Sequence, residues 1–169
     1  YAMYTSMLSK AIKQLKNLHE TNNHSHTDVD CYISTLIPQD YVEDIFLRLD
    51  IYNDISNAKN DYDINHIVSK LEDVYGPIPD YLKNLFSLTR VKIEGNRIKA
   101  DKIKINKENT VITLNPKSLI DNDKLINHFV LKNKIKLIDQ YNLKYQNISK
   151  DNFCELCEEV ISMMKDVSD

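Results

Sequence analysis

Apolar residues recur at intervals of three or four positions in several stretches of the chain, which is the pattern of amphipathic helices. We predict helices over residues 2–19, 40–55, 61–75, 79–93, 119–131 and 151–164. The polar segment 20–27 between the first of these and the next apolar run is predicted to be a loop.

The helix that begins at Asp40 is expected to open with a capping box, because Glu43 follows Asp40 at the required spacing. Its predicted buried face consists of Val42, Ile45, Phe46, Leu49, Tyr52 and Ile55. Gly76, followed by Pro77, is placed to end the helix over 61–75, and Gly95 is expected to close the helix that Pro79 opens.

Other segments alternate between apolar and polar residues, as half-buried strands do. They cover residues 29–35, 103–105, 111–114, 135–138 and 143–145, with a polar turn at 106–109 joining the second and third. The sequence therefore predicts an α+β fold, in which a helix cluster packs with a small antiparallel sheet.

Composition narrows the possible functions. The 169 residues carry a net charge of −3 and are 42% hydrophobic, which suits one compact domain and argues against a dedicated nucleic-acid binder. No apolar run approaches the roughly 18 residues of a membrane span. Gly76 and Gly95 are the only glycines, which excludes a glycine-rich phosphate cradle, and we expect no cofactor. Three cysteines fit a reducing, cytoplasmic location.

Charge is distributed unevenly along the chain. Residues 28–80 hold 12 acidic and 3 basic side chains, whereas residues 81–150 hold 15 basic and 6 acidic ones. The acidic half could meet a basic partner, or the two halves could complement each other or be solvated.

Candidate chemical groups have simpler structural explanations. Cys154 and Cys157 have C-x-x-C spacing but lie within a predicted helix and lack a second ligand pair, so we expect buried structural cysteines. His24 and His26 lie in the polar loop, and no catalytic or metal site is assigned. The basic stretch Arg97, Lys99, Lys102, Lys104 and Lys107 could touch phosphate or protect a strand edge. Arg48 is expected to form a structural ion pair, with Asp44 as one candidate partner.

Two segments carry a resemblance to a known family. They read Ile37-Pro38-x-x-Tyr41-Val42-x-Asp44-x-x-x-Arg48-Leu49-x-x-Tyr52-x-x-Ile55-x-x-Ala58 and Leu71-Glu72-Asp73-Val74-Tyr75-Gly76-Pro77-Ile78-Pro79. Their joint spacing resembles the C-terminal domain of bacterial transcription-repair coupling factors (Mfd). The resemblance extends to the first residues, which look like the segment that leaves the preceding motor. It implies a division into an entry helix and polar loop over 1–27 and a single regulatory domain over 28–169.

The resemblance implies a non-catalytic role within an ATP-driven DNA translocase that displaces stalled RNA polymerase. The domain would pack on a UvrB-like module of the same parent chain, mask the surface that recruits UvrA and restrain the motor. Lys70, Glu72, Asp73 and Val74 would form the clamp contact, and Arg48, Tyr52, Gly76 and Pro79 would be structural. Lys70 and Val74 depart from the Glu and Arg of the family pattern, so the contact is expected to depend on Asp73.

Two alternatives remain open at the level of sequence. One is a free-standing α+β adaptor that binds other proteins. The other is a weak nucleic-acid-binding module that uses the basic half, residues 81–150, although direct contact with nucleic acid is not expected in the regulatory role.

Overall fold

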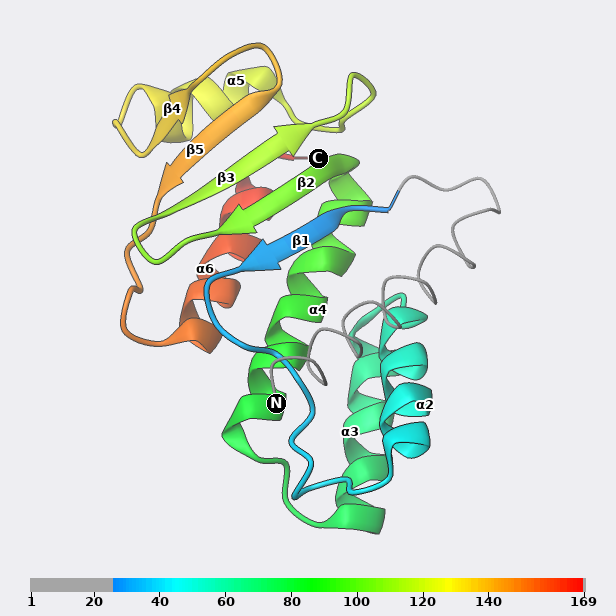
Figure 1. The fold of residues 1–169 in the computed structure, drawn as a ribbon. Coiled ribbons are helices and arrows are strands. Elements are labelled where there is room, and N and C mark those ends of the chain that lie inside the picture. Colours follow the sequence, from blue (N-terminus) through cyan, green and yellow to red (C-terminus); the bar gives the residue numbers. More distant parts are fainter. Residues whose placement is uncertain (1–25, 169) are drawn as a thin grey trace. The chain divides into compact units, whose positions relative to one another are not determined.

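The computed structural model describes residues 26–168, which divide into two compact units (Figure 1). The first unit contains residues 36–86, and the second contains residues 26–35 and 87–168. The boundary falls within helix α4 (Asp80–Ile98). The helix predicted over 2–19 lies outside the described residues.

In the first unit, helix α2 (Ile45–Ser56) begins later than predicted. The backbone N–H groups of Tyr41 and Val42 both donate to the Pro38 carbonyl, so the chain forms a turn around Asp40. The carboxylate of Asp44 then caps the helix by accepting from the backbone N–H of Phe46 at 2.7 Å. The capping box predicted at Asp40 and Glu43 is therefore wrong, because the turn at Pro38 places the helix start four residues further on.

The predicted buried face of α2 is also partly wrong. Phe46 is 74% exposed, whereas Arg48 and Ile51 are buried together with Tyr52 and Ile55. At 100° per residue, Phe46 lies about 160° around the helix axis from Arg48 and so points away from the buried side.

Helix α3 (Asp61–Tyr75) has the predicted extent. The Asn60 side chain accepts from the Asp63 backbone N–H and caps the start of the helix. Gly76 follows its last residue at φ 90°, a conformation that glycine adopts without steric cost. The prediction that Gly76 ends this helix is therefore confirmed.

Gly95 does not end α4, which continues to Ile98. A Cβ at position 95 would lie 2.8 Å from Thr27 Cγ2 and 2.9 Å from Ile103 Cδ1. The glycine thus permits a close approach between the helix and its neighbours, and the sequence-based expectation of a helix end was wrong for this reason.

The second unit is built on a five-stranded sheet of order β1-β2-β3-β5-β4. The strands are β1 (Asp28–Cys31), β2 (Ala100–Ile105), β3 (Asn109–Leu114), β4 (Ile135–Leu137) and β5 (Asn142–Gln146). The α+β prediction is confirmed, and three of the four strand pairings are antiparallel. The pairing of β1 with β2 is parallel instead, since the long segment between them returns the chain in the same direction.

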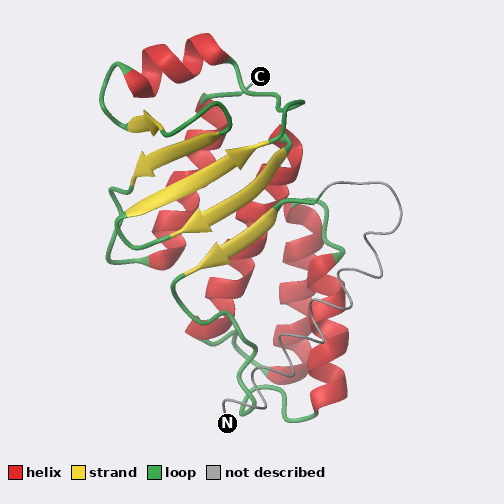
Figure 2. Ribbon diagram, turned by 45° about the horizontal axis from the view of Figure 1, so that its top comes forward, coloured by secondary structure: helices red, strands yellow, loops and turns green. Residues whose placement is uncertain are grey.

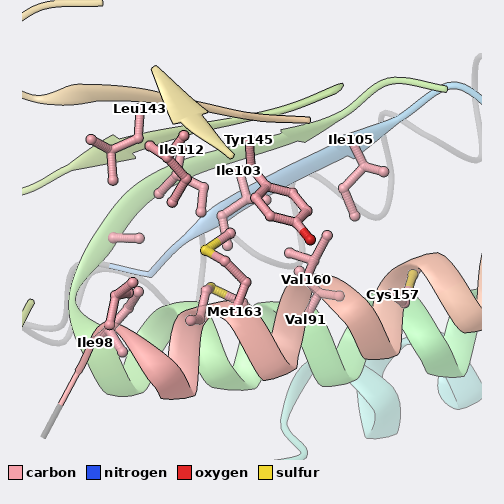
Figure 3. Packing of buried hydrophobic residues seen from close by; sticks show 14 of the residues in the cluster. Val91, Ile98, Ile103, Ile105, Ile112, Leu143, Tyr145, Cys157, Val160 and Met163 are labelled. Atoms are coloured by element: carbon pink, nitrogen blue, oxygen red, sulfur yellow. The ribbon is translucent and has the colours of Figure 1, made fainter. Parts of the chain in front are cut away.

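One face of the sheet is apolar and forms the core of the second unit. Ile103, Ile112 and Leu143 point from it toward helix α6 (Phe153–Asp166) and the last turns of α4 (Figure 3). The helix predicted over 119–131 is a single turn, α5 (Asn122–Leu125), that continues as the π-helical segment η1 (Ile126–Val130). Leu125 and Phe129 from this segment join the same core.

Candidate functional site

The C-terminal part of α3 carries the four residues predicted to form the clamp contact. Lys70, Glu72, Asp73 and Val74 are all exposed, and Val74 is 66% exposed. Lys70, Asp73 and Val74 fall within about 100° of the helix circumference, and the buried Leu71 lies about 160° around the axis from Asp73. The structure thus places these three side chains on one outward face.

Glu72 lies about 100° around the helix axis from Asp73 and so lies outside that face. The Tyr41 hydroxyl donates to the backbone carbonyl of Gly76 at 2.8 Å and lies near the Glu72 carboxylate. Burial, followed by the negative charge of Glu72, raises the pKa of Tyr41. The Tyr41 ring also packs on Tyr75 with a centroid distance of 5.6 Å, which holds the turn before α2 against the end of α3.

The position of Asp73 on α3 makes the helix end strongly negative. The C-terminus of a helix already carries a partial negative charge from its free carbonyl groups. The last turn of α3 contains no basic residue, and within residues 26–168 no ion pair engages the Asp73 carboxylate. This turn can therefore attract a cationic side chain of a partner.

Arg48 belongs to the first unit and is buried, with 1% of its surface exposed. Its Nη1 donates to the backbone carbonyl oxygens of Val42 at 2.5 Å and Glu43 at 2.8 Å. The predicted partner Asp44 instead caps α2. Arg48 thereby ties the loop before α2 to the helix itself.

Three further residues predicted to be structural occupy defined places. The Tyr52 hydroxyl accepts from the backbone N–H of Ile37 at 2.6 Å, and burial raises the pKa of Tyr52 to about 12. Gly76 donates its N–H to the Glu72 carbonyl, closing α3. The Pro79 carbonyl accepts from Leu82 at 3.0 Å and so begins the hydrogen-bond pattern of α4.

The cysteines lie within the second unit. Cys157 is fully buried in α6, and Cys31 and Cys154 are half-buried. Burial, with a smaller contribution from Cys154, raises the pKa of the Cys157 thiol. A neutral, buried thiol of this kind is a packing group and a poor nucleophile.

The remaining candidates do not converge on a reactive centre. Within residues 26–168, no three or more His, Cys, Asp or Glu side chains are arranged to hold a metal ion. His26 is exposed, and His24 lies outside the described residues. In that same part of the chain, no helix combines the length and the apolar character needed to cross a membrane.

The basic stretch of the sequence divides between two places. Arg97 faces Glu94 on α4, with its Nε 2.7 Å from Glu94 Oε1. Lys102 and Lys104 extend from β2 on the side opposite the core.

An aromatic residue that the sequence analysis did not single out lies on the outward face of α3. Tyr62 is 77% exposed and precedes Asp73 by three helical turns on the same side of the helix. Exposed aromatic side chains are enriched in protein interfaces. The sequence alone could have placed Tyr62 beside Asp73 on this face, because residues 11 positions apart in a helix lie on nearly the same side of its axis.

Comparisons with known proteins agree with this fold. A family model described as the TRCF domain matches residues 31–125, more than half of the chain, and the chain belongs to this family. Among similar proteins is the transcription-repair-coupling factor of Buchnera aphidicola subsp. Acyrthosiphon pisum, 30% identical over 139 residues that cover 80% of this chain and 17% of the relative.

Two further matches extend the likeness to most of the chain. The transcription-repair-coupling factor of Haemophilus influenzae is 24% identical over 99% of this chain and 15% of its own length. A crystal structure of the C-terminal domain of a transcription-repair coupling factor shares the fold, with a TM-score of 0.67 and 16% identity. That match covers 84% of this chain and 96% of the solved chain. The chain thus corresponds to a small part of the full-length relatives and to nearly all of the solved domain.

Proposed function

We propose that this chain is the non-catalytic C-terminal regulatory domain of a cytoplasmic transcription-repair coupling factor. In this role it packs on a UvrB-like module of the same parent chain, masks the surface that recruits UvrA and restrains an ATP-driven DNA translocase. The contact is released when the parent engages stalled RNA polymerase. Family membership and the fold shared with a solved C-terminal domain support the placement.

The observation that carries the clamp is the exposed carboxylate of Asp73 at the negative end of α3. An arginine of the partner module would gain from the Asp73 charge and from the helix dipole together. Lys70 stands on the same face and opposes such an arginine, whereas Val74 offers it an apolar surface in place of charge. Asp73 is therefore the residue on which we expect the contact to depend, with Glu72 as a secondary contributor.

Calorimetric binding of this chain to the isolated UvrB-like module at low and high salt tests the proposal. We expect Asp73→Ala to weaken binding about tenfold, which corresponds to about 1.4 kcal/mol. Asp54→Ala is the matched control, because Asp54 is also exposed in the first unit but lies on α2. A double-mutant cycle between Asp73 and the partner arginine should show coupling. Zero coupling would contradict the proposed contact.

The same substitution also needs testing in the intact parent protein, because tethering raises the effective concentration of a weak contact to the millimolar range. There, Asp73→Ala should increase UvrA binding by the parent, whereas Asp54→Ala should leave it unchanged. If UvrA binding is the same in both variants and in the wild type, masking by this face is refuted.

A further inference from the structure

The sheet of the second unit has one face that no described helix of that unit covers. Figure 2 shows α4 and α6 on the same side of the strands, behind the sheet. Alternation along the strands directs Ile103, Ile112 and Leu143 to that covered side. Their neighbours in sequence therefore lie on the open side, and three of these neighbours are exposed lysines: Lys102, Lys104 and Lys144. The exposed Lys136 of β4 lies on the same side, because it pairs with Lys144. We call these four residues the lysine face.

The strand register places the lysines close to one another. Lys104 pairs with Val111, Val111 pairs with Lys144, and Lys144 pairs with Lys136. Directly opposed side chains of like charge destabilise a sheet. Within residues 26–168, no hydrogen bond or ion pair takes up any of the four ammonium groups. Lys136 and Lys144 thus hold two positive charges opposite each other at a cost to stability.

Protection of a sheet edge does not explain this arrangement. Edge lysines discourage unwanted strand pairing, and Lys136 on β4 does lie on an edge strand. Lys102, Lys104 and Lys144, however, belong to β2 and β5, which have neighbours on both sides. Solvation does not require two lysines directly opposite each other, as Lys136 and Lys144 are. Among the strand residues, the acidic ones are Asp28 and Asp30 on β1 and Asp101 on β2. Asp28 and Asp30 pair in register with Lys102 and Lys104, so the positive charge without an acidic register partner lies on β5 and β4.

We propose that the lysine face binds the phosphate backbone of duplex DNA. Lys102 and Lys104 are about 7 Å apart along β2, and the β2 and β5 rows are about 10 Å apart across β3. The spacing of about 10 Å between the two rows lies between the widths of the B-DNA minor groove, about 6 Å, and major groove, about 12 Å. Lysine side chains are long and flexible enough to cover the difference between this spacing and either groove width.

The chemistry of the face favours phosphates over bases and over protein. It carries no arginine fork for reading base edges, and its strand residues include no aromatic ring on which a base could stack. An acidic protein segment would also need apolar anchor points, and Val111 is the single apolar side chain among the strand residues on this face.

Fluorescence anisotropy with the complete chain and a labelled duplex of about 20 base pairs tests the proposal at about 50 and about 200 mM salt. The face variant is Lys104→Glu with Lys144→Glu. The control is Lys59→Glu with Lys117→Glu, which changes the net charge equally at exposed positions outside the lysine face. We expect the face variant to lose at least tenfold in affinity and the control less than threefold. The slope of the logarithm of the binding constant against the logarithm of the salt concentration should become less steep by about two in the face variant. Each phosphate contact contributes about 0.9 to this slope, and the variant removes two lysines.

Four results would overturn the proposal, provided that circular dichroism shows both variants folded. The first is that the anisotropy of the labelled duplex does not change at low salt, and the second is that the face variant and the control lose equal affinity. The third is that a single DNA strand binds more tightly than the duplex. The fourth is that polyglutamate displaces the labelled duplex as effectively as unlabelled duplex does at equal charge. The last result would assign the face to an acidic protein partner.

Discussion

Replacing Gly95 by alanine should destabilise the chain, although alanine is the better helix former. The added Cβ would lie 2.8 and 2.9 Å from two side-chain atoms of Thr27 and 2.9 Å from Ile103 Cδ1. Thr27 cannot move away easily, because it is fully buried, its Oγ1 donates to the Ala100 carbonyl at 2.7 Å and its N–H donates to Asn96 Oδ1 at 2.7 Å.

The magnitude follows from two opposing effects. Overpacking of a buried site costs about 1–3 kcal/mol, and the pinned Thr27 places this site in the upper part of that range. The gain in helix propensity from glycine to alanine returns about 1 kcal/mol. We therefore expect Gly95→Ala to lower the free energy of unfolding by about 1–2 kcal/mol.

Urea denaturation of the complete chain, followed by circular dichroism, measures this change. The companion variant combines Gly95→Ala with Thr27→Ser, which removes the Cγ2 atom nearest to the new Cβ and keeps the hydroxyl. It should recover at least half of the loss. The reasoning is refuted if Gly95→Ala is as stable as the wild type, or if Thr27→Ser brings no recovery.

Two further predictions concern the first unit. Arg48→Met should lower the free energy of unfolding by about 2–3 kcal/mol, because the Val42 and Glu43 carbonyls lose a charged donor; a loss below about 0.5 kcal/mol in urea denaturation would contradict this. Because the pKa of Tyr52 is raised to about 12 from 10.0, the unfolded chain loses this proton first, and Tyr52 makes the wild type less stable as the pH rises from 10.0 to about 12. Tyr52→Phe should remove this part of the decline in the free energy of unfolding. The prediction is contradicted if urea denaturation gives parallel pH profiles for the variant and the wild type.

The two proposals for this chain use different units and opposite charges. The clamp contact depends on the carboxylate of Asp73 at the end of α3, whereas the lysine face depends on the ammonium groups of the sheet. Asp73→Ala should therefore leave duplex binding unchanged, and Lys104→Glu with Lys144→Glu should leave the effect of Asp73 intact. The two experiments can fail separately.

The sequence by itself determined those features that depend on neighbours along the chain. Helix α3 has the predicted extent because Gly76 supplies the positive φ and Pro77 prevents continuation. The strands β2 and β3 and the turn between them follow from alternation around a polar segment. The exposure of Asp73 follows from helical spacing, since the buried Leu71 lies on the other side of α3.

Only the tertiary structure decided the features that depend on distant contacts. Phe46 was expected in the core and is exposed, whereas Arg48 is buried and its Nη1 donates to two carbonyl groups before α2. Gly95 reads locally as a helix end, yet it lies inside α4 where Thr27 and Ile103 pack against it. The lysines of β2 and β5 become one surface through strand order, which local alternation does not specify. Local patterns record the backbone preferences of a segment, whereas burial and pairing are selected by the free energy of the whole packed chain.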